Sequence, residues 1–85
     1  MNIKVYDNGG ESLDRYSVIY LDDVEGNGLY GCRAMNAYPF HPQGIGMYCM
    51  AKIGKHLGKE IKFEQLPEDC QKVVKQDLEL EETNE

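Results

Sequence analysis

The sequence predicts an α+β fold, in which a small antiparallel sheet of a three-strand meander plus a later strand packs against one C-terminal helix. Short apolar segments alternate with glycine-rich turns in the first part of the chain, as in strands joined by hairpins. A later segment has apolar residues at three- and four-residue steps, which indicates an amphipathic helix. The 85 residues suit a single domain, residues 1–80, followed by an acidic tail, residues 81–85.

The predicted meander occupies the first 36 residues. Residues 3–6 alternate apolar with other side chains, so they predict a short strand with one buried face. An Asp-Asn-Gly-Gly turn follows, and residues 15–21 are apolar on both faces, as in a central strand. The next turn ends in an Asn-Gly pair, which favours a type I′ hairpin. Residues 29–36 then form the third strand, antiparallel to the second.

The remaining elements are a last strand and a helix. Residues 47–53 are apolar enough for a strand or a helical turn, and the sequence leaves both open. Residues 60–64 alternate apolar and charged side chains and predict the last strand. Pro67 suits a first helical position, and the acids after it complement the helix dipole. The apolar stripe of that helix is Leu66, Cys70, Val73, Val74 and Leu78. Residues 81–85 contain nothing to bury and are expected to fray.

The net charge of −6 is unevenly distributed. Residues 1–30 carry six acids and two bases, and residues 64–85 carry eight acids and two bases. Residues 31–63 carry five bases and one acid. Three cysteines are an odd number with no paired spacing, and no run of 18 apolar residues occurs. We therefore expect a cytoplasmic protein without a membrane span, whose middle segment is basic and whose flanks are acidic.

The segment 37–49 is rich in aromatic residues and fits no regular period. Pro39 and Pro42 fix the backbone φ angle, whereas Gly44 and Gly46 allow turns, so the segment predicts a stiff loop. Two interpretations are open. Its aromatic and apolar side chains cap the core of a small domain, or they form a binding surface, because binding residues concentrate on loops held by a scaffold. The side chains concerned are Tyr38, Phe40, Ile45 and Tyr48.

Metal and catalytic sites are not expected. Cys32, His41, Cys49 and His56 are seven to nine residues apart, whereas structural zinc ligands usually come in pairs two to four residues apart. A calcium loop starting at Asp23 would need a carboxylate where Ala34 stands. No nucleophile elbow or related signature surrounds a cysteine or serine. We therefore predict no cofactor, no metal and no enzymatic activity.

Five short motifs occur along the chain from Asp7 to about Leu78: DNGG (7–10), DRY (14–16), PFHPQG (39–44), HLGK (56–59) and LP (66–67). In these motifs the chain resembles a family of small uncharacterised proteins from phages, plasmids and bacterial genomes. The resemblance implies a mobile-element or bacterial cytosolic context, in which small acidic proteins are often accessory factors or inhibitors that dock on a host protein. It implies no catalytic residue.

Together these features predict a non-enzymatic binding module with a protein partner. Aromatic residues are enriched at interface hot spots, so the loop is the expected contact surface. The alternative is nucleic-acid or anion binding by the basic middle, because lysines contact phosphates and aromatic rings stack on bases. Self-association through the loop or an exposed strand edge is a third possibility. The candidate binding residues are Tyr38, Phe40, His41, Gln43, Tyr48, Lys52, Lys55, His56 and Lys59.

Overall fold

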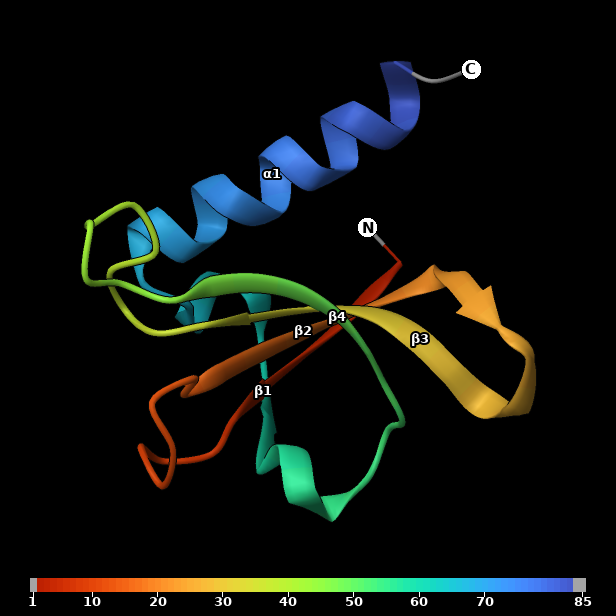
Figure 1. Ribbon diagram of the computed structural model, residues 1–85, viewed down its shortest axis with the longest axis horizontal. Helices are drawn as coiled ribbons and strands as arrows, with labels where there is room; N and C mark the ends of the chain where they lie inside the picture. The colour runs from red at the N-terminus through yellow and green to blue at the C-terminus, as the bar shows by residue number, and fades with distance from the viewer. Residues whose placement is uncertain (1, 84–85) are drawn as a thin grey trace.

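The computed structural model describes residues 2–83 and shows a five-stranded antiparallel sheet with one C-terminal helix. The strands are β1 (Ile3–Asp7), β2 (Tyr16–Glu25), β3 (Leu29–Met35), β4 (Gly46–Ala51) and β5 (Lys59–Ile61). Their order in the sheet is β4-β3-β2-β1-β5, so the chain runs as a meander through β4 and returns to pair β5 with β1. Helix α1 (Glu68–Thr83) lies across one side of the sheet (Figure 1). The predicted α+β class is confirmed.

Apolar residues pack on both faces of the sheet, because adjacent residues of a strand point in opposite directions. The helix-side cluster joins Val5, Val18 and Met35 of the sheet to Cys70 and Val74 of α1. The far-side cluster is smaller and lies on the other face. It contains the buried residues Tyr6, Ile19, Cys32 and Leu57.

The segment that the sequence left undecided forms β4, an edge strand without a charged residue. It forms a strand because all six of its residues pair with β3, from Tyr30↔Ala51 to Met35↔Gly46. At the hairpin between β2 and β3, Asn27 and Gly28 have φ angles of 68° and 75°. These positive angles are what the predicted type I′ turn requires at its central residues.

The predicted last strand, residues 60–64, is partly wrong. Pairing with β1 stops at Ile61, and a short 3₁₀ helix, η3 (Phe63–Gln65), follows. The Gln65 side-chain oxygen accepts the Lys62 backbone N–H at 2.8 Å, which turns the chain away from the sheet. This turn lets Phe63 pack against the helix-side cluster. Helix α1 continues to Thr83, into the segment expected to fray, and residues 84–85 lie outside the described residues.

Candidate functional site

The loop between β3 and β4 encloses a hollow of about 390 Å³. Three residues predicted from the sequence as binding residues, Tyr38, His41 and Gln43, line it together with Asn36 and Gly44. Residues 36–45 contain no Asp, Glu, Lys or Arg, although they lie in an acidic protein. The hollow therefore offers aromatic and amide groups without a fixed charge. We call residues 36–45 the aromatic loop.

Asn36 fixes the ends of the aromatic loop. Its side-chain oxygen accepts hydrogen bonds from the backbone N–H groups of Tyr38, at 3.0 Å, and Ile45, at 3.1 Å. Its own N–H donates to the Ile45 carbonyl at 3.1 Å, and its carbonyl accepts from the Cys70 thiol at 3.1 Å. One side chain thus joins both ends of the loop, and the Asn36 carbonyl ties the loop to α1. Asn36 was not among the residues predicted from the sequence, because an Asn at the end of a strand is an ordinary turn signal.

Two successive turns shape the interior of the aromatic loop. The His41 N–H donates to the Tyr38 carbonyl at 3.1 Å, and the Gly44 N–H donates to the His41 carbonyl at 2.8 Å. A Cβ at Gly44 would overlap the Tyr38 carbonyl, so only glycine fits there. The His41 Nδ1 accepts the Gln43 N–H at 3.0 Å, which in the neutral ring leaves the proton on Nε2. These bonds, with the two fixed proline φ angles, support the predicted stiffness.

The interpretation that the aromatic side chains of this loop cap the core is wrong for Tyr38 and Phe40. Their side chains are 66% and 52% exposed. Ile45 is half-buried. The reason is local: the turns and the Asn36 bonds satisfy the backbone of the loop without help from its rings, and α1 already covers the core beside it. Two large rings therefore stand in solvent, and one of them, Tyr38, lines the hollow.

Tyr48 has a different environment from the aromatic loop. It lies on β4, where its ring stacks with Tyr20 at a centroid distance of 6.0 Å, and the Arg33 guanidinium lies 5.2 Å from its centroid. Its hydroxyl donates to the Asp23 carboxylate, and Gly31 leaves room for this contact because a Cβ there would meet both groups. These contacts hold the edge strand in place.

Arg33 and Tyr20 connect the sheet to the helix through Asp77. Arg33 donates from Nη2 and Nε to the two Asp77 oxygens at 2.6 and 3.0 Å, and the Tyr20 hydroxyl donates at 2.5 Å. The hydrogen bond to Asp77 raises the pKa of Arg33. Burial, and then the bond to Asp77, raise the pKa of Tyr20. The residues are up to 57 positions apart, so sequence spacing carried no signal of this network.

The basic residues do not join the aromatic loop. Lys52, Lys55 and His56 are exposed on residues 52–58, a connection that we call the basic segment and that packs Leu57 into the far-side cluster. Lys59 begins β5, at the opposite edge of the sheet from β4. The aromatic loop contacts the helix side instead, and Figure 1 shows the two segments apart. Among the described residues, no carboxylate lies within 4.0 Å of these lysines.

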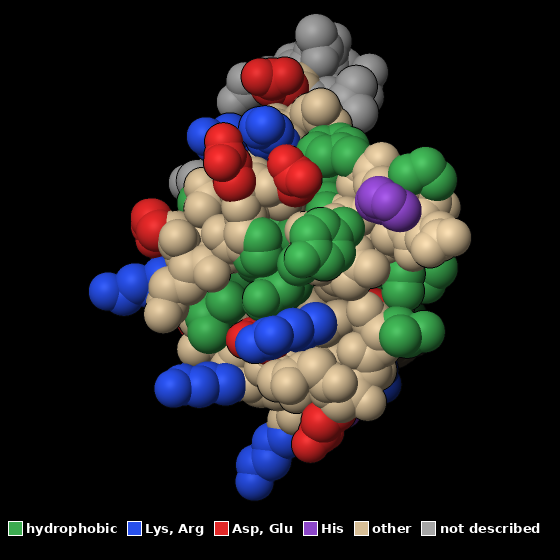
Figure 2. Space-filling view, turned by 90° about the vertical axis from the view of Figure 1, so that its left-hand side faces the viewer, with side chains coloured by type: hydrophobic (Ala, Val, Ile, Leu, Met, Phe, Trp, Pro, Cys, Tyr) green, Lys and Arg blue, Asp and Glu red, His purple; other side chains and the backbone are tan. Residues whose placement is uncertain are grey.

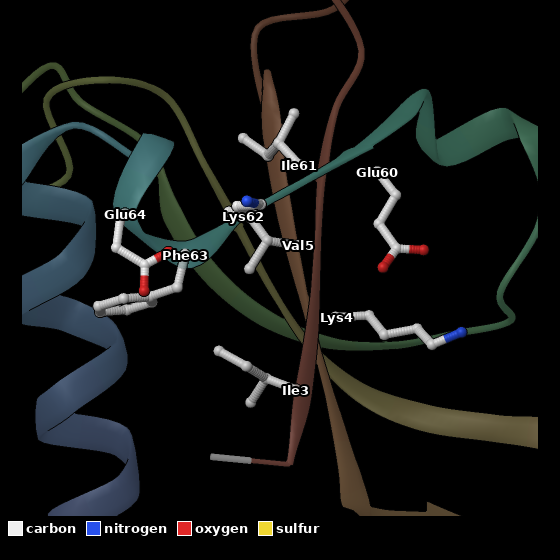
Figure 3. A pocket seen from close by; sticks show the side chains of 8 residues that line it. All are labelled: Ile3, Lys4, Val5, Glu60, Ile61, Lys62, Phe63 and Glu64. Carbon is white, nitrogen blue, oxygen red and sulfur yellow. The ribbon is translucent and has the colours of Figure 1, made fainter.

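A second hollow, of about 350 Å³, lies beside β1, β5 and η3. Ile3, Val5 and Phe63 line it on the side of α1, whereas Lys4 and Glu60 point the other way (Figure 3). Hydrophobic side chains gather in the middle of the face shown in Figure 2, with both acidic and basic side chains around them. The predicted site did not include this hollow, because it forms where the expected strand 60–64 turns away from the sheet.

Three of the motifs that carry the family resemblance meet in space. Asp7 of the DNGG motif accepts hydrogen bonds from Arg15 of the DRY motif at 2.8 and 3.1 Å. Gly58 of the HLGK motif has a φ angle of 97°, and a Cβ there would lie 2.5 Å from the Asn8 Cα. These contacts are within the scaffold and give no indication of a ligand.

Within residues 2–83, no group of three His, Cys, Asp or Glu side chains is placed to hold a metal ion. In the same part of the chain, no helix has the length and apolar character needed to cross a membrane. Comparison with known proteins found no matching family model, curated protein or solved structure.

Proposed function

We propose that the chain is a non-enzymatic protein-binding module whose contact surface is the aromatic loop. The observation that supports this most is the combination in one stiff loop of a hollow of about 390 Å³, lined by Tyr38, and two exposed rings, Tyr38 and Phe40. Ordering a flexible loop costs binding free energy, and this loop is ordered by its own hydrogen bonds. Aromatic residues are also the side chains most often found at interface hot spots.

The chemistry of the loop indicates the kind of partner. The hollow has aromatic walls, a Gln43 amide and, in neutral His41, an Nε2–H donor. Such a surface suits an apolar protein side chain flanked by hydrogen-bond acceptors. Because the loop has no fixed charge, binding should change little with salt. In the mobile-element context that the family resemblance implies, this module would act as an accessory factor or inhibitor of a host protein.

The test is affinity capture from bacterial lysate with matched variants. Wild-type protein is compared with a Tyr38→Ala, Phe40→Ala variant and with Leu13→Ala, an exposed apolar residue outside the loop. The resin must not carry streptavidin, because His41-Pro42-Gln43 matches a tripeptide of streptavidin-binding peptides. We expect one protein that the wild type and Leu13→Ala retain and the loop variant loses. Equal retention by all three folded proteins would contradict the proposal.

Anion or nucleic-acid binding by the basic segment is the second candidate. Its lysines are exposed and have no described ion-pair partner, so their charge is available to phosphates. Phosphate contacts weaken steeply with salt. The test is binding of a labelled single-stranded oligonucleotide by a Lys52→Glu, Lys55→Glu variant and by a Lys72→Glu, Lys75→Glu control on α1. Loss in the first variant alone, with a steep salt dependence in the wild type, would support this alternative over the aromatic loop.

A further inference from the structure

Two of the three cysteines lie directly opposite each other on neighbouring strands. Cys32 of β3 and Cys49 of β4 are partners in the antiparallel register, and both are free thiols. Opposite residues of antiparallel strands have Cα atoms about 4.5 to 5.5 Å apart, and disulfides span about 4.4 to 6.8 Å. Paired residues also project their side chains from the same face. The register therefore sets the two cysteines at a backbone separation that a disulfide can span.

The two thiols differ in their access to solvent. Cys32 is 2% exposed within the far-side cluster, whereas Cys49 lies half-buried on the edge strand. Burial raises the pKa of the Cys32 thiol, and its contact with the Cys49 thiol raises it further, while a hydrogen bond with Ser17 lowers it. A reagent from solvent thus meets Cys49 first. Cys32 is in contact with that thiol and can act on it once it is modified.

Cys70 provides an internal comparison. It belongs to the helix-side cluster, on the other face of the sheet from Cys32, and its thiol donates to the Asn36 carbonyl at 3.1 Å. Burial raises its pKa to about 11. It is as free and as buried as Cys32, but it has no cysteine opposite it. If Cys32 is oxidised and Cys70 is not, the difference is therefore due to the position of Cys49 opposite Cys32.

We infer that Cys32 and Cys49 form a dithiol that closes to a cross-strand disulfide on reaction with a low-molecular-weight disulfide such as oxidised glutathione. In the first step the Cys49 thiolate attacks one glutathione sulfur, forming a mixed disulfide and releasing one glutathione, which takes up the Cys49 proton. The Cys32 thiolate then attacks the Cys49 sulfur and releases the second glutathione, which takes up the Cys32 proton. The two protein thiols are oxidised, and one glutathione disulfide is reduced to two thiols.

The disulfide would join an inner strand to the edge strand of the sheet. It adds a covalent bond between β3 and β4, two strands that non-covalent contacts join now. The aromatic loop connects the same two strands. Oxidation would thus close a covalent ring of residues 32–49, and the backbone of the aromatic loop is part of this ring. The inference is independent of the proposed function.

The experiment measures which thiols are lost from the folded, full-length protein. The protein is equilibrated with graded ratios of oxidised to reduced glutathione and then quenched with acid. It is unfolded, alkylated and digested, and mass spectrometry measures the mass of each cysteine peptide. We expect Cys32 and Cys49 to lose alkylation together and to appear as one linked peptide pair, while Cys70 stays fully alkylated. Three alkylated cysteines at every ratio, or a disulfide that includes Cys70, would overturn the inference.

Two variants separate the steps. Cys32→Ser should stop at the mixed disulfide, so that Cys49 gains the mass of one glutathione, and Cys49→Ser should leave Cys32 alkylated. A wild-type protein that keeps glutathione on Cys49 without forming the internal disulfide would also overturn the inference. Circular dichroism shows whether each variant is folded. If one does not fold, the mapping of the wild-type peptides decides the question by itself.

Discussion

The two segments that flank β4 are held in place by different means. The aromatic loop on its N-terminal side is fixed by hydrogen bonds that the Asn36 side chain accepts, and it carries no fixed charge. The basic segment on its C-terminal side has two backbone turn bonds and buries one side chain, Leu57. Polar bonds therefore order one connection, and apolar burial orders the other. The comparison shows that the segment with the exposed rings does not depend on those rings for its structure.

The largest effect that we predict comes from the apolar anchor. Leu57→Ala removes the one side chain of the basic segment that is buried in the far-side cluster, 8% exposed, and should lower the free energy of unfolding by about 2 to 4 kcal/mol. Urea denaturation measures this change. Ile53→Ala, on a side chain 39% exposed just before the segment turns, is the control and should cost about 0.5 kcal/mol or less. Equal effects of the two substitutions would show that Leu57 is not the anchor.

The aromatic loop should respond to Asn36→Ala. This change leaves the N–H groups of Tyr38 and Ile45 without their acceptor, so we expect a loss of about 1 to 2 kcal/mol, because water replaces part of the lost bonding. Hydrogen exchange of these two amides should become faster, with no change in the basic segment. Gln43→Ala, which removes an exposed side chain, serves as the control. Slow exchange in Asn36→Ala would mean that the prolines alone hold the loop.

Acid should weaken the ion pair between Asp7 and Arg15. Gly58, the last residue of the basic segment, packs against the backbone of Asp7 and Asn8. Hydrogen bonds from Arg15 lower the pKa of Asp7 below its usual value of 3.8. A carboxyl whose pKa is lower in the folded state stabilises the protein above its unfolded-state pKa, and this contribution is lost as the pH falls through the folded-state value. The urea midpoint should therefore fall as the pH drops from about 5 through the lowered folded-state pKa of Asp7, and part of this fall should be absent in Arg15→Gln. An identical pH profile for both proteins would contradict a role for this pair.

The smallest effect on stability should come from the exposed lysines. Lys52→Glu combined with Lys55→Glu should change the free energy of unfolding by no more than about 0.5 kcal/mol, because neither lysine has a described ion-pair partner. Thermal denaturation followed by circular dichroism measures this change. A larger loss of stability would mean that these lysines help to order the basic segment. The conclusion that burial of Leu57 alone orders this segment would then be wrong.

The sequence predicted those elements that have a local cause. Alternation in residues 3–6 predicted β1 to within one residue, and the apolar stripe with Pro67 predicted the start of α1, although α1 continues to Thr83, into the segment expected to fray. β4 stayed undecided, because an edge strand without charged residues shows no alternation. The sequence predicted Phe63 on a strand, because apolar and charged residues continue to alternate past Ile61. In the structure the hydrogen bond between Lys62 and Gln65 turns the chain, and the strand ends at Ile61.

The candidate site could be predicted only in part, for a similar reason. Tyr38, His41 and Gln43 lie within one loop, so their proximity follows from the sequence, and the structure places all three around one hollow. The positions of the lysines depend on how the chain crosses from one edge of the sheet to the other, which spacing along the sequence does not encode. The facing cysteines depend on strand register, which remained unknown while β4 was undecided.

The open side of β4 has a practical consequence for handling this protein. The outer edge of this strand has no strand beside it, and its six residues include no proline, lysine or other charge that would deter a second chain. Met47 and Met50 are 57% and 37% exposed along it. At the millimolar concentrations of nuclear magnetic resonance samples, a lysine in place of Met47 would keep the chains apart. It would leave the Asn36 contacts and the facing thiols in place.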